Sequence, residues 1–341
     1  MQSITTSQQW RGSSNGDFEK TIGIVLNQTF QEKLNYYGSV KEPFFFMISY
    51  DLTQSVVYPL KKLPSFIKYE INEKVSTSNQ NLALKKYPIS FNTYKKKFQS
   101  VQEQIRSGNS YLLNLTAKTP IESALSLDEI YAKASSKFKL QYKDQFVCFS
   151  PERFVQIKNN TIETFPMKGT IDAKIKNAKR IILNNEKERA EHIMVVDLLR
   201  NDLSIVAKKV RVKKFRYVES LKAGNKTLLQ VSSKIAGTLP KNWHENIGDI
   251  IIKLLPAGSI TGTPKKKTVE ILKEIEKYNR GFYTGIAGFF DGETLDSCVM
   301  IRFINIEQQQ YVYHSGGGIT SRSDCKNEYN EYKQKIYIPV F

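Results

Sequence analysis

Two apolar runs on either side of Asp291-Gly292 constrain the fold more than any other feature of this sequence. The runs, at 282–290 and 295–304, contain many aromatic and β-branched residues, which favour strands. Because Asp-Gly is a preferred turn pair of tight hairpins, we expect these two runs to pair antiparallel. Residues 311–314 provide a third run, and the sequence therefore predicts an antiparallel meander near the carboxyl end.

The rest of the chain mixes short strand patterns with helical ones and shows no internal division. No long repeat is present, and no linker rich in glycine, serine or proline interrupts the chain. We therefore expect one large α+β domain over residues 1–341, with a lysine-rich surface excursion that ends near residue 90. The expected strands are at 44–51, 56–60, 111–118, 146–149 and 154–157, and the expected helices are at 92–106, 177–203 and 324–336.

The composition is that of a globular protein with a basic surface. The 341 residues are 40% hydrophobic and 11% aromatic, which is enough to bury a large core. The formal charge of +18 comes from lysines in short scattered runs, without arginine clusters, zinc-ligand spacing or an aromatic RNA-binding pattern. A solvated basic surface explains this charge, and steering of an anionic substrate is a further explanation. A nucleic-acid-binding protein is the distant alternative, and we expect no nucleic-acid partner.

The sequence predicts a soluble, cytoplasmic protein without membrane association. It contains no uninterrupted apolar run of about 18 residues, and its polar start lacks the apolar core of a signal peptide. Cys148, Cys298 and Cys325 have no metal-like spacing. Their odd number fits reduced thiols better than a disulfide framework.

The segment FPMKGTI at 165–171 places Lys168 between a proline and a glycine. Pro166 restricts the backbone and Gly169 permits a tight turn, so the lysine would be displayed on a stiff loop. An amine attacks only when it is neutral, so an active Lys168 needs a pKa lowered by burial or by neighbouring cations. The alternative is an ordinary solvated lysine in a turn.

Four glutamates form two pairs with helical spacing. Glu188 and Glu191 lie three residues apart on one expected helix, and Glu328 and Glu331 do so on another. Each pair can therefore present two carboxylates on one helix face. If the pairs face each other they need a cation, and Mg²⁺ suits hard oxygen ligands. The alternative is two ordinary charged helix faces that neighbouring basic residues neutralise.

Three consecutive glycines, Gly316, Gly317 and Gly318, stand between an expected strand and the last expected helix. Such a run can turn backbone N–H groups toward a carboxylate, and Arg302 can bind further oxygens through its planar fork. The glycines then predict an anion-binding pocket. A flexible turn is the alternative.

These segments occur in the order that is typical of one family. The chain resembles the chorismate-utilising enzymes from about residue 92 to 336, and residues 1–90 are similar to a shortened form of the family's N-terminal region. The resemblance implies an α+β fold in which antiparallel sheets form a sandwich-like core with helices packed outside, and a catalytic core at 91–341. The matching segments are SPERF (150–154), PMKGT (166–170), ERAEHIMVVDLLRNDL (188–203), PAGSITGTPK (256–265), RGFYTGIAGFFDG (280–292), IRF (301–303), and SGGGI (315–319) followed by EYNE (328–331) and Lys335.

Within this family the PMKGT segment resembles that of aminodeoxychorismate synthase component I. That enzyme aminates chorismate at C4 with ammonia to 4-amino-4-deoxychorismate, in the route to 4-aminobenzoate and folate. Anthranilate synthases typically carry alanine at the place of Lys168, whereas isochorismate and salicylate synthases carry a lysine base at the place of Leu112. The resemblance therefore implies amination through a covalent Lys168 adduct. Anthranilate synthase component I is the alternative enzyme.

The resemblance also implies a role for each matched polar residue. Glu152 would protonate the departing C4 hydroxyl, so burial should raise its pKa and should lower the pKa of Lys168. The two glutamate pairs would hold Mg²⁺, which would anchor the ring carboxylate of chorismate. The substrate-binding residues would be Thr170, Ser259, Tyr283, Arg302, the amides of Gly316, Gly317 and Gly318, and Lys335.

Two positions depart from the family pattern, and one partner is implied. Leu112 replaces the usual glutamine of the central strand. Gln230 replaces a histidine, so any acid-base role of that histidine is lost here. The sequence shows no glutaminase segment with a cysteine nucleophile, so we expect free ammonia or a partner glutamine amidotransferase subunit as the nitrogen source.

Overall fold

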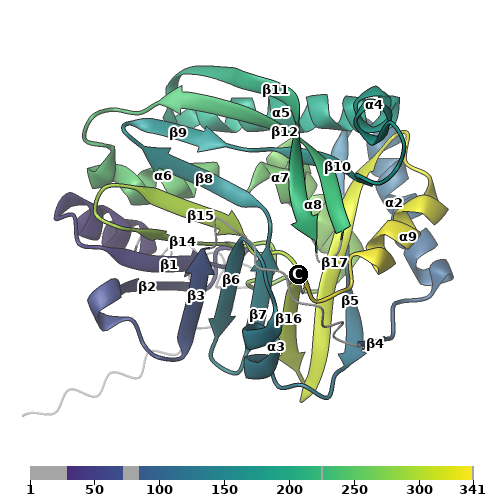
Figure 1. Ribbon diagram of the computed structural model, residues 1–341, viewed down its shortest axis with the longest axis horizontal. Coiled ribbons are helices and arrows are strands. Elements are labelled where there is room, and N and C mark those ends of the chain that lie inside the picture. The colour runs from purple at the N-terminus through teal and green to yellow at the C-terminus, as the bar shows by residue number, and fades with distance from the viewer. Residues whose placement is uncertain (1–28, 72–83, 224–225, 340–341) are drawn as a thin grey trace, which may run out of the picture.

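Two antiparallel sheets organise the computed structural model, which describes residues 29–71, 84–223 and 226–339 (Figure 1). The first sheet has the strand order β10-β12-β9-β8-β15-β14-β1-β2, and β11 pairs with β12. Its strands are β1 (Phe44–Ile48), β2 (Ser55–Pro59), β8 (Arg153–Lys158), β9 (Thr161–Thr164), β10 (Met167–Asp172), β11 (Lys208–Ala223), β12 (Lys226–Thr238), β14 (Ile286–Phe290) and β15 (Leu295–Val299).

The second sheet has the strand order β13-β5-β17-β16-β7-β6-β3, and β4 pairs with β5. In Figure 1 its strands stand nearly upright, whereas most strands of the first sheet run across the view. Its strands are β3 (Ile67–Ile71), β4 (Lys85–Lys86), β5 (Leu112–Glu122), β6 (Phe138–Tyr142), β7 (Phe146–Ser150), β13 (Gly262–Thr263), β16 (Phe303–Glu307) and β17 (Gln310–Thr320).

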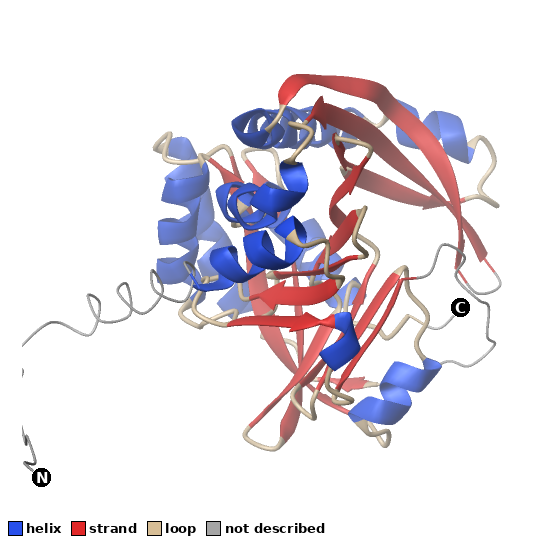
Figure 2. Ribbon diagram, turned by 90° about the vertical axis from the view of Figure 1, so that its left-hand side faces the viewer, coloured by secondary structure: helices blue, strands red, loops and turns tan. Residues whose placement is uncertain are grey.

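Helices lie outside the two sheets (Figure 2). Residues 29–39 are helical, and two short 3-10 turns cover Leu60–Lys62 and Trp243–Asn246. The α-helices are α2 (Phe91–Arg106), α3 (Leu127–Lys133), α4 (Ala178–Asn184), α5 (Glu186–Val206), α6 (Ile247–Leu254), α7 (Gly258–Thr261), α8 (Lys265–Glu276) and α9 (Cys325–Gln334).

The apolar strand β1 contributes side chains to two layers of the core. Side chains alternate between the faces of a strand. Phe45 and Met47 therefore pack between the sheets, with residues of β6, β7 and β16. Phe44 and Phe46 point the other way and pack with α5 and α6. A third apolar cluster joins β5 and β17 to α2, α8 and α9. The expected α+β fold, with a sandwich-like core and helices outside, is confirmed.

The hairpin around Asp291-Gly292 is confirmed, but the expected meander is wrong. β14 and β15 pair from Ile286↔Val299 to Phe290↔Leu295, and Gly292 has a φ of +103°. The chain then leaves the first sheet through Arg302, which has a φ of +55°, so β16 pairs with β7 and β17 in the second sheet. The apolar pattern identified the strands but does not record which sheet receives each one.

The single helix expected at 177–203 is two helices. Asn185 has extended backbone angles and separates α4 from α5, and its side chain accepts a hydrogen bond from the Glu188 N–H. Asparagine is a favoured N-cap, so this residue was the signal for a new helix start. The other expected strands and helices have counterparts in the structure. The surface excursion expected to end near residue 90 is partly wrong, because its described parts contain β3 and β4, which pair with β6 and β5 of the second sheet. Residues 72–83 of this segment, like the start of the chain at 1–28, lie outside the described residues.

Candidate active site

Lys168 projects from a β-bulge rather than from the expected loop. The register of β10 against β12 shifts between Met167↔Ser232 and Thr170↔Gln230, so Lys168 and Gly169 together oppose one partner residue. Gly169 has a φ of +82°, which a residue with a side chain rarely adopts. The glycine therefore serves the expected purpose of a tight local bend, within a strand.

The ammonium of Lys168 forms an ion pair with Glu191 of α5. The distance from Lys168 Nζ to Glu191 Oε2 is 2.9 Å. Burial by itself lowers the pKa of Lys168, but the Glu191 carboxylate, with smaller contributions from Glu331 and Glu188, raises it above its ordinary value. The expectation of a lowered pKa is therefore wrong for this arrangement, because nearby carboxylates outweigh desolvation.

Glu152 lies in the turn between β7 and β8, near Lys168. Its backbone N–H donates to Ser150 Oγ at 3.1 Å, which fixes the turn. Desolvation raises the pKa of the Glu152 carboxyl, while Ser259, Lys168 and Lys335 partly offset the shift. The raised pKa agrees with the expectation for a carboxyl that stays protonated and can act as a general acid.

Buried hydrogen bonds hold Ser259 next to Glu152. Its carbonyl accepts a hydrogen bond from Asn114 Nδ2 of β5 at 2.7 Å. Arg280 donates to the Asn114 carbonyl at 2.7 Å and to the Ile260 carbonyl at 3.2 Å. Arg280 is itself paired with Glu276 at 2.7 Å, and both side chains are almost fully buried. The strand and the short helix α7 are therefore tied together beneath the site.

Glutamates of the two pairs approach each other from α5 and α9. Lys187 joins them, since its Nζ lies 3.0 Å from Glu328 Oε1 and 3.9 Å from Glu191 Oε1. Burial, and then the nearby Glu191 charge, raises the pKa of Glu188. Burial acts in the same direction on Glu331, but the Lys335 ammonium outweighs it and lowers the pKa of that carboxyl.

The carboxylate cluster has donor chemistry suited to a divalent cation. Within the described ranges, no three His, Cys, Asp or Glu side chains are arranged to hold a metal ion as they stand. However, Glu191 Oε1 is buried without a hydrogen-bond partner, and buried oxygens of this kind normally have one. Oxygen donors on two facing helices, with one oxygen unsatisfied, are of the kind that Mg²⁺ prefers.

The glycine run is part of strand β17 and not the expected turn between a strand and a helix. Gly316 to Gly318 are paired with residues 114–116 of β5, while the ladder from β17 to β16 ends at His314. The Gly316 carbonyl accepts a hydrogen bond from Lys335 Nζ at 2.9 Å, and Lys335 also pairs with Glu331 at 2.7 Å. Because N–H and C=O of one strand residue point the same way, the Gly316 N–H faces this charged edge.

Gly318 makes room for Lys168, which leads to a first prediction. A Cβ at Gly318 would lie 3.1 Å from Leu112 Cδ1 and 3.4 Å from Lys168 Nζ. Gly318→Ala should therefore displace the lysine and lower kcat by about 100-fold, the cost of a small misplacement at a reacting centre. Thermal unfolding should change little, because both neighbouring atoms end flexible side chains.

Gly317→Ala is the comparison for this prediction. Its added Cβ would meet Lys335 Nζ at 3.5 Å and Glu331 Oε1 at 3.6 Å, which are ordinary contacts. Its kcat should fall less than that of Gly318→Ala. A wild-type rate for Gly318→Ala in a steady-state assay would contradict the prediction.

Three expected substrate-binding residues lie in other surroundings. Arg302 Nη1 donates to the Lys335 carbonyl at 3.0 Å, and its guanidinium covers the Tyr337 ring at 4.6 Å. The Tyr283 ring is buried 4.9 Å from that of His314. Thr170 is exposed on β10. The structure thus brings together Lys168, Glu152, Ser259, Lys335 and the four glutamates. Arg302, Tyr283 and Thr170 have the other surroundings just described.

Sequence reasoning gave no site role to Lys187 or Asn114. Lys187 directly precedes Glu188 in α5 and looked like one more charge on a helix face. Asn114 is two residues after Leu112, so the period of two placed both side chains on one face of β5. That spacing was the available signal for Asn114.

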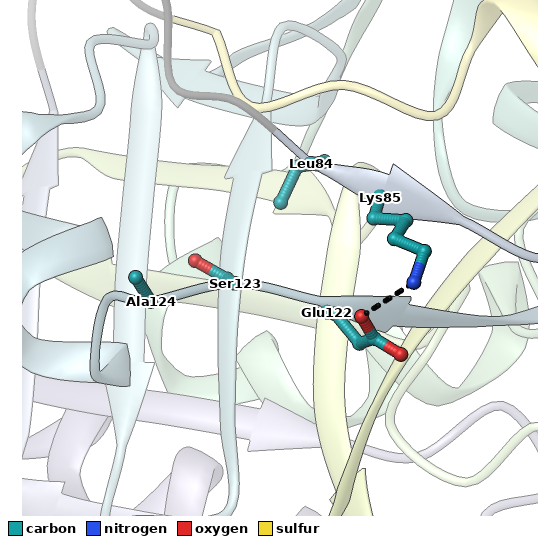
Figure 3. Close-up of a pocket in the computed structure, with 5 residues that line it drawn as sticks. All are labelled: Leu84, Lys85, Glu122, Ser123 and Ala124. Carbon is teal, nitrogen blue, oxygen red and sulfur yellow. Dashed lines mark ion pairs between the residues drawn. The ribbon is translucent and has the colours of Figure 1, made fainter.

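A surface hollow of about 660 Å³ lies apart from this cluster (Figure 3). Its lining includes Lys85 and Glu122, which form an ion pair at 3.2 Å. Glu122 ends β5, whereas Leu112 begins that strand, so the hollow is at the opposite end of β5 from the lysine and glutamate cluster. We do not assign it to the active site.

Comparison with known proteins identifies the family. The model of the chorismate binding enzymes matches residues 48–340. The chain belongs to this family. A Haemophilus influenzae protein described as an uncharacterized PabA-like protein is 47% identical over 318 residues, which cover 92% of this chain and 97% of that protein.

Two further proteins are similar to this chain. Aminodeoxychorismate synthase component 1 of Salmonella typhimurium is 33% identical over 262 residues, which cover 71% of this chain but only 56% of that protein. The crystal structure of anthranilate synthase component I from Streptococcus pneumoniae has a TM-score of 0.63 at 25% identity, and covers 76% of this chain and 60% of that one. Among the described residues, no helix is long and apolar enough to cross a membrane.

Proposed function

We propose that this chain is an aminodeoxychorismate synthase component I, which aminates chorismate at C4 in the route to 4-aminobenzoate and folate. The position of Lys168 carries the proposal. Its amine lies beside Gly318 and Leu112, near Glu152, whose carboxyl has a pKa that burial raises. Leucine at 112 has no proton-accepting group, so no residue there can activate water for hydration at C2.

The proposed reaction uses Lys168 as nucleophile and Glu152 as acid. The neutral amine forms a bond to C2 of chorismate while the bond between C4 and its hydroxyl breaks, and Glu152 gives the leaving hydroxyl a proton. Ammonia then bonds to C4, and the bond between C2 and the lysine nitrogen breaks. In sum, chorismate and ammonia become 4-amino-4-deoxychorismate and water.

The ion pair with Glu191 defines the first requirement of this reaction. It keeps Lys168 charged, so the lysine must lose a proton before it attacks. Glu191 Oε2, at 2.9 Å from Nζ, is the group that the ammonium contacts. The ion pair also orients the Lys168 side chain, since it holds Nζ in one position next to the β-bulge.

The charged groups around this pair would bind the two carboxylates of chorismate. One carboxylate would be held by Lys335, Arg302 and the Gly316 N–H. Lys335 follows α9 and donates to the Gly316 carbonyl of β17, and Arg302 donates to the Lys335 carbonyl. Glu188, Glu191, Glu328 and Glu331 would hold Mg²⁺, which supplies positive charge for the ring carboxylate. Thr170, Ser259 and Tyr283 would complete the pocket wall.

A glutamine amidotransferase subunit is the proposed physiological source of ammonia. The three cysteines support this reading, because Cys148 and Cys298 are buried, Cys325 is partly buried, and burial raises the pKa of each thiol. Such thiols are poor nucleophiles. We therefore expect product with ammonium salts, and product from glutamine only after an amidotransferase partner is added.

The product distinguishes this function from its alternative. The chain is incubated with chorismate, Mg²⁺ and an ammonium salt, and an aminodeoxychorismate lyase is added afterwards. We expect 4-aminobenzoate only after the lyase, and mass spectrometry should find a chorismate-derived adduct on the peptide that contains Lys168. Fluorescent anthranilate formed without the lyase would overturn the proposal in favour of anthranilate synthase.

A further inference from the structure

Lys187 lies at the centre of the carboxylate cluster but has no part in the proposed chemistry. Its Nζ is 3.0 Å from Glu328 Oε1 on α9 and 3.9 Å from Glu191 Oε1 on its own helix. One ammonium therefore bridges two carboxylates from facing helices. This is the electrostatic task that a divalent cation would perform for the same two residues.

The three side chains differ in their access to water. The side chains of Glu191 and Glu328 are only 7% and 3% exposed, whereas that of Lys187 is 38% exposed. Two buried carboxylates that face each other require a counter-ion, because like charges repel strongly away from water. The carboxylates are fixed in the interior, but the lysine has a flexible stem and a path to solvent.

Glu191 Oε1 adds an independent observation. It is buried and accepts no hydrogen bond, since Lys187 at 3.9 Å is too distant to donate one. Lys187 thus pairs closely with Glu328 and shares Glu191 with Lys168, which contacts Oε2, but Glu191 Oε1 stays unsatisfied. A ligand that contacts Glu191 Oε1 and Glu328 Oε1 directly would satisfy the two carboxylates better.

We propose that Lys187 is a built-in counter-ion that competes with the divalent cation for Glu191 and Glu328. The ammonium stabilises the facing carboxylates when no cation is bound, and it swings toward solvent when one binds. Metal binding must therefore displace an existing ion pair, which weakens the apparent affinity. This inference rests on the metal site of the proposed function.

The test is calorimetric titration of the full chain with Mg²⁺ alone, without turnover. Lys187→Gln should bind Mg²⁺ about tenfold more tightly than the wild type, a change within the usual range of coupling between competing states. In a chelator this variant should unfold at a lower temperature than the wild type, and saturating Mg²⁺ should remove the difference. Lys187→Arg keeps the charge and should bind no more tightly than the wild type.

Lys326→Gln is the matched control. It removes the same charge from an exposed position on α9, two residues before Glu328. Its Mg²⁺ affinity should equal that of the wild type, so a general effect of net charge is excluded. If the wild type binds Mg²⁺ and Lys187→Gln binds it equally or more weakly, the proposal that Lys187 competes with the cation is wrong, while the metal site itself is retained. Absence of binding in every variant would overturn both.

Discussion

Replacing Lys168 with alanine should abolish the amination of chorismate, because the reaction loses the atom that bonds to C2. No other amine in the site has the same position, since Lys335 contacts Gly316 and Glu331, and Lys187 bridges two glutamates. Product is measured as 4-aminobenzoate after the coupled lyase step. Binding of chorismate with Mg²⁺, followed by calorimetry, should survive the change.

Two further variants separate the nucleophile from the ion pair. Lys168→Arg keeps a cation beside Glu191 but removes the nucleophilic amine, so it should be as inactive as Lys168→Ala. Because it keeps the ion pair, it should unfold at a higher temperature than Lys168→Ala. Lys234→Ala is the matched control, because Lys234 also pairs with a glutamate in the same sheet, at 2.8 Å from Glu163. It should retain activity. A wild-type rate for Lys168→Arg would remove this lysine from the mechanism.

Replacing Glu152 with glutamine should lower kcat by about 100- to 10,000-fold, the usual range for loss of a general acid. Glutamine has nearly the same shape but no proton to give to the leaving hydroxyl. The variant should also lose one limb of the pH profile. In the wild type, the rate should fall as pH rises through the raised pKa of Glu152, because the carboxyl then loses the proton it must donate.

The same carboxyl predicts a pH dependence of stability. Its folded-state pKa lies above the unfolded value, so the folded protein binds this proton more tightly. The stability that Glu152 contributes is therefore fully present below the unfolded pKa and is lost as pH rises through the folded pKa. Thermal unfolding of Glu152→Gln should lack that loss. Parallel pH curves for the variant and the wild type, in rate and in unfolding, would contradict the assignment.

Local sequence patterns predicted most elements of the fold. The Asp-Gly turn identified the β14 and β15 hairpin, and the spacing of apolar residues identified α2. The assignment of strands to sheets was not available from these patterns, because period-two alternation looks the same in either sheet. Likewise, the apolar spacing of 177–203 continued across Asn185, and only the cap geometry shows that a second helix begins there.

The candidate site was predictable where the chemistry depends on residue type. Lysine at 168, leucine at 112, glutamate at 152 and two pairs of helical glutamates are properties of the sequence, and their order along the chain indicated a chorismate enzyme. The glycine run was also recognisable as a special segment. Its conformation was not, because glycine is equally compatible with a turn and with a strand that passes close to charged side chains.

The sequence by itself determined which groups are present and the family to which the chain belongs. The tertiary structure alone decided the charge environment of Lys168 and the contacts of Lys187. A pKa depends on burial and on charges within a few ångströms, and Glu191, the carboxylate that raises the pKa of Lys168 most, is 23 residues away along the chain. Glu328, which Lys187 contacts, is 141 residues away. Local patterns carry no information about such distances, and folding alone creates them.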